Sequence, residues 1–168
     1  GENWFANLPQ SGGPGIDLHI HDSDFIVYIL GVPDSVYSSG ILIEGEYAQY
    51  IATHYAYEDL GVTITAQSGA IAHSARPFEH GFDVYFDNAT VQYNSSWGSP
   101  LCVVTSDGVE EPQLSAEDGF VREVQYAVDT IANDTEPTLL SGQSARDSLA
   151  LCWREVESVR TGSVVRLK

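Results

Sequence analysis

The chain has little positive charge and no methionine. Among its 168 residues, 24 acidic side chains stand against 7 basic ones, and the formal net charge is −17. Such an excess of negative charge opposes binding to phosphate backbones and to anionic lipid headgroups, so we expect neither nucleic acid nor a membrane as a partner. Because the sequence begins with Gly1 and lacks methionine, we expect it to be part of a longer translation product.

Cysteine and long apolar runs are also scarce. The two cysteines, Cys102 and Cys152, have no C-x-x-C spacing, and no secretory segment precedes them. We therefore expect two reduced, buried thiols and a cytoplasmic location. No run approaches the roughly 20 apolar residues of a membrane span. With 43% hydrophobic residues, the chain has enough apolar content for one globular domain, which we expect to span residues 1–168.

The stretch from Ser11 to Gly31, SGGPGIDLHIHDSDFIVYILG, contains the main candidates for chemistry. At about 100° per residue, four polar side chains fall on one stripe of a helix: Asp17, His21, Asp24 and Tyr28. Apolar residues occupy most of the remaining positions. A thin polar line on an apolar helix predicts burial on most sides, with the line facing a cleft.

Glycine and proline mark both ends of this predicted helix. Gly12, Gly13 and Gly15, with Pro14 between them, allow a close approach of the backbone before the first turn. Gly31, followed by Pro33, is a typical stop signal.

The rest of the chain predicts strands and two further helices. Residues 1–10 have no clear period and are expected to form an extended lead-in, with Trp4 and Phe5 packed on the body. Six runs rich in β-branched and aromatic residues follow the first helix: Ser35 to Ile43, Ala48 to Tyr57, Gly61 to Ser74, His80 to Phe86, Ala89 to Tyr93 and Leu101 to Thr105. Asp87 and Asn88 predict a hairpin turn between the fourth run and the fifth, because both residue types tolerate the left-handed conformation.

Helical spacing then recurs from Ser115 to Asn133 and from Ser144 to Arg160, and Ser163 to Leu167 can form a last strand. The order predicts an α+β fold, a mainly antiparallel open β-sheet of about six or seven strands with helices packed on one face. The many tyrosines of the strands favour a covered sheet face, covered either by the chain's own helices or by another subunit.

The Gly-Gly turn that leads into Asp-x-x-x-His resembles the signature of the Gfo/Idh/MocA oxidoreductases, the family that contains glucose-fructose oxidoreductase and inositol dehydrogenases. The segments PLCVVTSDG, DGFVREVQYAVDTI and SARDSLALCWREVESVRTGSVVRL resemble the closing helices and strand of that family in order and spacing. The resemblance implies the C-terminal substrate and oligomerisation domain of an NAD(P)-dependent dehydrogenase. It also implies a sugar, cyclitol or similar polyol as substrate and a homodimer or higher oligomer formed through the sheet face.

The resemblance places the catalytic pair at His21 and Asp17. Oxidation of an alcohol needs a group that takes the hydroxyl proton, and an imidazole can do so near neutral pH. Asp17, one turn earlier, could orient the imidazole or bind a neighbouring hydroxyl. We expect Asp24, Tyr28 and Gly13 to contribute to substrate binding. From spacing alone, Asp17 and His21 could equally form a local ion pair.

Two motifs of the family are missing. No G-x-G-x-x-G follows a predicted strand, and a Glu-Lys-Pro motif cannot occur because the one lysine is Lys168. The N-terminal Rossmann domain is therefore expected outside this chain. We expect NAD or NADP to be bound in the full-length protein, with no cofactor held tightly by residues 1–168, which should be inactive alone.

Two other interpretations remain open. His19 and His21 resemble the metal-binding H-x-H of the first strand of amidohydrolases, which are barrels of about 250 residues. Alternatively, the chain is a non-catalytic dimerisation or scaffold module. His73, Arg76 and His80 could line a ligand pocket or could be ordinary turn residues, and Trp97 could stack on a sugar.

Overall fold

The computed structural model describes Trp4 and residues 7–168, and the packing expected of Phe5 lies outside these residues. Contacts divide the chain into two compact units, Gly1–Ile71 with Glu136–Lys168, and Ala72–Thr135. We describe each unit by itself.

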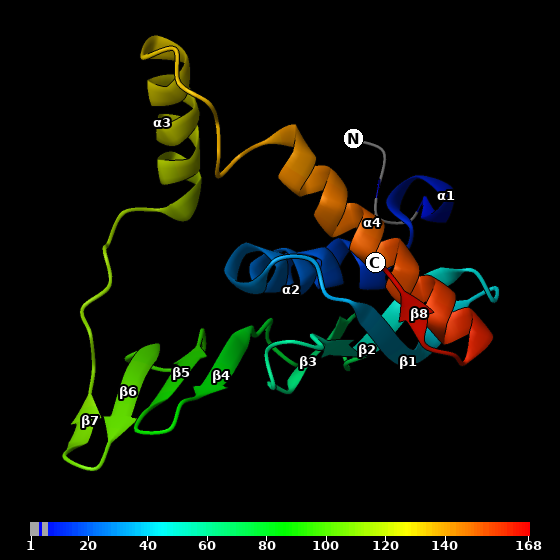
Figure 1. The fold of residues 1–168 in the computed structure, drawn as a ribbon, viewed down its shortest axis with the longest axis horizontal. Helices are drawn as coiled ribbons and strands as arrows, with labels where there is room; N and C mark the ends of the chain where they lie inside the picture. Colours follow the sequence, from blue (N-terminus) through cyan, green and yellow to red (C-terminus); the bar gives the residue numbers. More distant parts are fainter. Residues whose placement is uncertain (1–3, 5–6) are drawn as a thin grey trace. The chain divides into compact units, whose positions relative to one another are not determined.

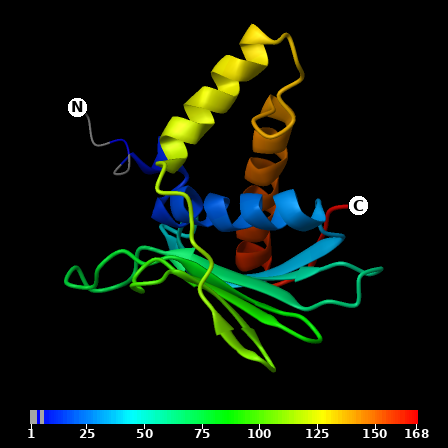
Figure 2. The same cartoon turned by 90° about the vertical axis from the view of Figure 1, so that its left-hand side faces the viewer.

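The first unit consists of helices packed on an antiparallel sheet of order β3-β2-β1-β8 (Figure 1). Its strands are β1 (Ser35–Ile43), β2 (Tyr47–Ala56), β3 (Ile64–Gly69) and β8 (Val165–Arg166), and its helices are α1 (Leu8–Ser11), α2 (Pro14–Leu30) and α4 (Gly142–Thr161). Helix α2 packs against β2, β3 and α4, while α4 also contacts β1 (Figure 2). Both long helices therefore cover the same face of the sheet.

The core of this unit lies between the sheet and the two long helices. Alternation along the strands directs Val36 and Tyr55 toward the helices, where they are 1% and 0% exposed. Helix α4 contributes Leu151 and Val156, which are likewise buried. Burial of each such side chain favours folding by about 1.5–3 kcal/mol, so this layer fixes where α2 and α4 lie.

A close backbone contact sets the start of α2. Gly13 has φ +99°, and a Cβ at that position would lie 2.4 Å from the carbonyl oxygen of Ala48 on β2. A Cβ at Gly15 would lie 2.8 Å from the same oxygen. The amide of Ala48 donates a hydrogen bond of 3.2 Å to the Gly12 carbonyl. Only glycine allows the helix to begin against the strand in this way.

The second unit contains a four-stranded antiparallel sheet of order β4-β5-β6-β7 and the helix α3 (Gly119–Ala132). The strands are β4 (Gly81–Tyr85), β5 (Thr90–Asn94), β6 (Leu101–Thr105) and β7 (Gly108–Glu110). Helix α3 begins after Asp118, whose side chain accepts a hydrogen bond from the amide of Phe120. Most apolar residues of α3 are exposed, with Phe120 at 78% and Ile131 at 81%.

The predicted α+β fold is confirmed, with mainly antiparallel strands and helices packed on a sheet. The eight strands of the described part form two sheets of four instead of one sheet of six or seven. The hairpin at Asp87 and Asn88 is present and is closed by a 2.8 Å bond from the Phe86 amide to the Ala89 carbonyl. Among the described residues, however, positive φ outside glycine occurs at Glu44 and Asp134 and not in this turn.

The structure corrects three smaller expectations. The lead-in is not wholly extended, since residues 8–11 form the single turn α1. The third strand ends at Gly69, and residues 70–80 form an exposed loop. Cys152 is buried as expected, whereas Cys102 is only half-buried, and neither is in a disulfide. No helix among the described residues is long and apolar enough to cross a bilayer.

Candidate functional site

The predicted stripe lies on one helix, α2, on the side turned away from the sheet. Asp17 is half-buried in the first turn, and His21, one turn later, is exposed. Tyr28 is 69% exposed. The helix therefore brings the predicted catalytic pair together on a face that other groups can reach.

Asp24 also lies on this side, and it is tied to the neighbouring helix. Its carboxylate oxygen Oδ1 accepts a 2.6 Å hydrogen bond from the Ser148 hydroxyl of α4. Gly13 is buried, and its amide donates to the Ser11 hydroxyl at 3.2 Å. Its amide is thus directed into the turn, and Ala48 fills the space where a side chain would be.

The expected burial of the helix on most sides is wrong for its last two turns. Phe25 is 39% exposed, Ile29 54% and Leu30 38%. In the described part of the chain these apolar side chains of α2 face outward together with Tyr28, because the sheet and α4 cover only the opposite side of the helix.

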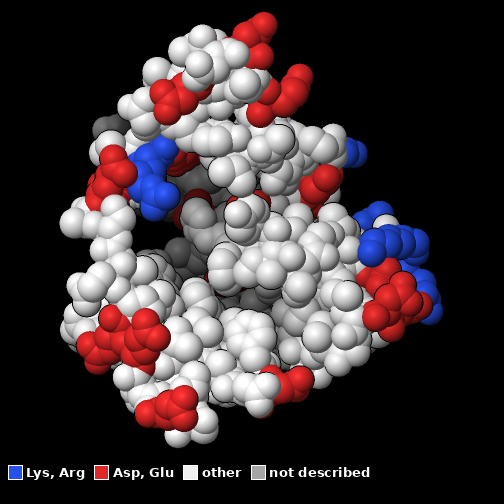
Figure 3. Space-filling model, turned by 60° about the vertical axis from the view of Figure 1, so that its left-hand side comes forward, with Lys and Arg blue, Asp and Glu red and all other residues white. Residues whose placement is uncertain are grey.

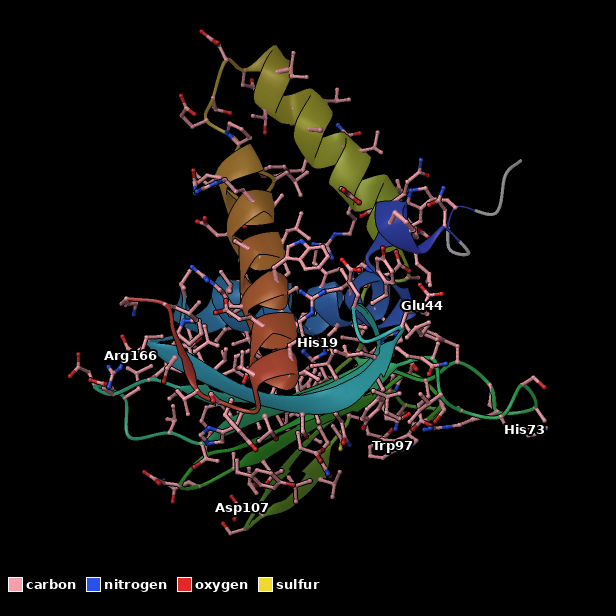
Figure 4. All side chains as sticks on the ribbon, turned by 90° about the vertical axis from the view of Figure 1, so that its right-hand side faces the viewer. His19, Glu44, His73, Trp97, Asp107 and Arg166 are labelled. Atoms are coloured by element: carbon pink, nitrogen blue, oxygen red, sulfur yellow. The ribbon has the colours of Figure 1, made fainter. Side chains whose placement is uncertain are left out.

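The side of α2 that faces the sheet contains a buried polar cluster that the sequence did not reveal. His19 and Ser23, one turn apart, are both 0% exposed. The Nδ1 atom of His19 lies 2.6 Å from the Ser68 hydroxyl of β3, and its Nε2 lies 3.1 Å from Oε2 of Glu155 on α4. Figure 4 shows His19 in this layer. The tyrosine hydroxyl of Tyr55 is 3.2 Å from the same Nε2.

Glu155 is a second ionisable member of this cluster, and it is 0% exposed. The Ser23 hydroxyl donates to its two carboxylate oxygens at 3.2 and 3.4 Å. Burial, and then the nearby Glu155, raise the pKa of the Cys152 thiol to about 12. The same two causes raise the pKa of the Tyr55 hydroxyl above its usual range, so both groups stay protonated at neutral pH.

One signal in the sequence could have located this cluster. Ile16, His19, Ser23 and Ile26 follow one another at steps of three and four and are all buried. A histidine and a serine between two core isoleucines indicate polar groups with a buried partner. The identity of that partner, Glu155, depends on the packing of α4.

The H-x-H interpretation is not supported by this geometry. His19 and His21 lie on a helix and point to nearly opposite sides, whereas metal binding by H-x-H needs a strand. No group of three or more potential metal ligands occurs among the described residues.

The residues of the second unit that were considered for a ligand pocket have local partners. Arg76 pairs with Glu79 at 3.2 Å in the exposed loop, and Glu79 also accepts from the Asn94 amide at 2.7 Å. His80 lies between the rings of Phe78 and Tyr93, with centroids 5.8 and 5.6 Å away. Trp97 is 45% exposed in the loop after β5. These contacts fit the interpretation of His73, Arg76 and His80 as loop and strand-edge residues.

The surface charge follows the composition. Acidic side chains are scattered over the face in Figure 3, with few lysines or arginines among them. Several of the basic residues pair with surface carboxylates, as Arg154 does with Glu157 at 2.7 Å.

Comparisons with known proteins found similar folds and no close relative. No family model and no curated protein matches the sequence. Among solved structures, a protein described as an NADPH-dependent oxidoreductase from Desulfitobacterium hafniense matches with a TM-score of 0.77 and 22% identity, over 98% of this chain and 51% of that one. A levoglucosan dehydrogenase in complex with NADH and L-sorbose matches with a TM-score of 0.78 and 16% identity, over 99% and 54%.

A third match is an oxidoreductase from Agrobacterium radiobacter in complex with NAD+, L-tartaric acid and magnesium, with a TM-score of 0.72 and 21% identity over 99% of this chain and 54% of that one. The chain spans about half the length of the structures that it matches. At these identities the comparison concerns the fold. The fold is similar to one half of these oxidoreductases, as the resemblance implied for the fold.

Proposed function

We propose that this chain is the C-terminal, substrate-side domain of an NAD(P)-dependent oxidoreductase that acts on an alcohol group of a sugar, cyclitol or similar polyol. The observation that carries the proposal is the pair Asp17 and His21, one turn apart on the outward side of α2. The pair lies in a fold that matches half of several oxidoreductases, among them levoglucosan dehydrogenase in complex with NADH and levoglucosan.

His21 is the proton-transfer group in this proposal. When an alcohol carbon loses hydride, the hydroxyl proton must pass to a base within hydrogen-bond reach. The exposed imidazole of His21 can approach a bound substrate, and Asp17 can orient that imidazole or accept a hydrogen bond from an adjacent substrate hydroxyl. Asp24 and Tyr28, further along the same side, are placed to contact other hydroxyls. Gly13 contributes by fixing the turn from which the helix starts.

We assign no dinucleotide site to the described residues. The glycine turn before α2 is closed by the backbone of Ala48, which leaves no space there for a pyrophosphate. We therefore assign binding of NAD or NADP to a Rossmann domain outside this chain. The part of these residues in the reaction is the handling of the proton and the orientation of the substrate.

The test is a dehydrogenase assay of the protein that the complete gene encodes, with NAD+ and NADP+ and a panel of sugars, cyclitols and polyols. His21→Ala is expected to lower kcat by about 10²- to 10⁴-fold, because it removes the general base. His73→Ala is the matched control, since His73 is exposed in the loop of residues 70–80. An unchanged kcat in His21→Ala would contradict the proposal.

A second candidate, an oligomerisation module, is favoured by the outer face of the first sheet. Tyr37 and Ile41 of β1 are each 48% exposed on the side opposite the helices. We propose that a homodimer or higher oligomer forms through this face. If the complete protein lacks a Rossmann domain, this association is its function; otherwise it accompanies catalysis.

A further inference from the structure

The apolar side of α3 has no part in the chemistry proposed above. At about 100° per residue, five of its side chains fall on an arc of about 100°, and we call this set the α3 stripe: Phe120, Val121, Val124, Val128 and Ile131. Each of the five is more than half exposed to solvent. Soluble monomeric proteins rarely leave a continuous apolar surface of this kind uncovered, so the α3 stripe indicates a contact surface.

The other side of α3 is polar and has local partners. Gln125 donates a 2.7 Å hydrogen bond to Asp129, and Thr130 is buried. The amide of Thr135, just after the helix, donates to the Thr130 carbonyl at 3.0 Å. Asp118 caps the first turn. The polar side and both ends of the helix are thus satisfied locally, which leaves the α3 stripe for a partner.

The charge of α3 argues against a lipid surface as that partner. Helices that lie on membranes usually have lysine and arginine on their polar side. Helix α3 instead has Glu123 and Asp129 there, with Arg122 as its one basic residue. The net charge of −17 adds repulsion from anionic headgroups. The α3 stripe therefore suits a protein surface.

The size of the α3 stripe favours a contact within one polypeptide over an association of two copies through this helix. Its five side chains expose on the order of 100 Å² each, so a partner that covered them would bring the total buried area to about 1,000 Å². Stable interfaces between separate chains bury about 1,200–2,000 Å². Interfaces between domains of one chain bury about 600–1,500 Å², because the connecting chain keeps both surfaces at a high effective concentration.

The outward side of α2 is also partly apolar, but it does not match the α3 stripe. His21 and Asp24 lie on that side, and the α3 stripe has no hydrogen-bonding group to offer them if they were covered. The apolar part of α2, from Phe25 to Leu30, is about 8 Å long, whereas the α3 stripe extends over about 17 Å. A larger apolar surface is needed.

We propose that the α3 stripe is the surface on which the half of the protein outside residues 1–168 docks. The chain spans only 51% and 54% of the structures that it matches, so in proteins of that length a further segment of similar size is available. The proposal rests on the proposed function, in which that half binds NAD or NADP. We expect the receiving surface to be an apolar groove with basic side chains at its rim, opposite Glu123 and Asp129.

Hydrogen exchange of the α3 amides tests the proposal, in residues 1–168 and in the protein that the complete gene encodes. Exchange should be at least about tenfold slower in the complete protein, because a docked helix opens less often. The α4 amides are the internal reference, since the core residues of α4 are buried within residues 1–168 and its exchange should be alike in both.

Three results would overturn the proposal. The first is equal exchange of α3 in the two proteins, and the second is a gene that encodes no further domain. The third is slow exchange of α3 in residues 1–168. Slowing that grows with protein concentration would identify a second copy as the partner, and slowing independent of concentration would identify a surface of the same 168 residues.

The variant Val124→Lys places a charge in the middle of the α3 stripe. In the complete protein it should speed exchange of α3 at least about tenfold and lower Tm by at least about 3 °C, because a buried charge would face an apolar groove. In residues 1–168, where Val124 is already exposed, Tm should stay within about 1 °C. Unchanged exchange of α3 in the complete Val124→Lys protein would contradict the proposal.

Gln125→Lys is the matched control, because it introduces the same side chain on the polar side of α3, beside Asp129. It should change neither exchange nor Tm, and an effect as large as that of Val124→Lys would contradict the proposal. Ile131→Gln, at the other end of the α3 stripe, is the milder second variant and should also speed exchange of α3 in the complete protein.

These readouts need no enzymatic activity. A complete protein in which α3 is protected but His21→Ala leaves kcat unchanged would contradict the proposed function alone. An active dehydrogenase in which α3 exchanges as fast as in residues 1–168 would contradict the docking proposal alone.

Discussion

Position 13 imposes two constraints that only a glycine satisfies. Its φ of +99° is unfavourable for side chains, and a Cβ would lie 2.4 Å from the Ala48 carbonyl oxygen. We predict that Gly13→Ala lowers the free energy of unfolding by about 3 kcal/mol, through backbone strain and overpacking together. Urea denaturation measures this change.

Gly45 offers a matched control for the Gly13 prediction. It has a similar positive φ of +72°, but a Cβ there meets no atom within 4 Å. Gly45→Ala should therefore lower the free energy of unfolding by about 1 kcal/mol, through backbone strain alone. Equal losses in the two variants would show that the contact with Ala48 has no energetic role.

Because of Tyr57, we predict that the fold loses stability at alkaline pH. Its hydroxyl donates a 2.7 Å hydrogen bond to the Gly31 carbonyl, at the end of α2. Burial, and then the charge of Asp34, raise the pKa of Tyr57 to about 12. Because the folded pKa is above the unfolded value of about 10, the contribution of Tyr57 to stability is complete below pH 10 and is lost as the pH rises toward 12.

The variant Tyr57→Phe tests this dependence. At pH 7 it should lower the free energy of unfolding by about 1 kcal/mol, the usual net value of such a hydrogen bond. The difference from the unaltered chain should shrink between pH 10 and 12, as measured by urea denaturation at each pH. Tyr37→Phe, at an exposed tyrosine of β1, is the control. A constant difference over this range would contradict the prediction.

At the scale of elements, α3 and α4 differ in what supports them. Phe120, Val124 and Ile131 of α3 are 78%, 63% and 81% exposed, whereas Leu151 and Val156 of α4 are buried. A 14-residue helix whose apolar side chains are mostly exposed is marginal in water. We predict that the amides of α3 exchange with deuterium at least about tenfold faster than those of α4. Hydrogen-exchange mass spectrometry checks this, and equal protection would contradict it.

Most helices and strands were predictable because glycine and proline mark their ends and the spacing of their apolar residues is regular. The bounds of β1 and β6 agree with the predicted runs, and Gly31 ends α2 where the stop signal lies. Strand β7, with three residues, is too short to show a period. The division into two sheets depends on which strands pair, and this is decided by contacts between distant residues.

The candidate site was predictable on one side of α2 only. The spacing of Asp17 and His21 predicted that both lie on one side of the helix, because that alignment depends on helix geometry alone. The buried polar cluster around His19 was not predicted, because the partner of His19 is a glutamate on a helix far along the chain. A buried polar contact of this kind becomes visible only when the tertiary packing is known.

At the scale of the whole molecule, cofactor binding separates the proposed domain from a complete enzyme. The glycine turn that leads into α2 is packed against the backbone of Ala48. We predict that fluorescence titration of this chain with NADH or NADPH shows no saturable binding at micromolar concentrations. Low-micromolar binding to the chain would contradict the assignment of the nucleotide to a separate domain.

Association of whole chains is a separate prediction. If the outer face of the first sheet is an interface, size-exclusion chromatography with light scattering should give a dimer or higher oligomer. Tyr37→Lys with Ile41→Lys should shift it to the monomer, because both side chains are about half exposed on that face. Phe78→Lys, on the exposed loop of the second unit, is the control. A monomeric unaltered chain would exclude this interface.

The hydrogen bonds that hold α2 to the sheet and those that its stripe could offer to a ligand come from different residues. Evolution or protein engineering can therefore replace an outward residue such as Tyr28 while the anchoring contacts of His19 stay intact. A combinatorial library restricted to the outward positions should contain a high proportion of folded members. The substrate preference of the domain can in this way change while its fold is kept.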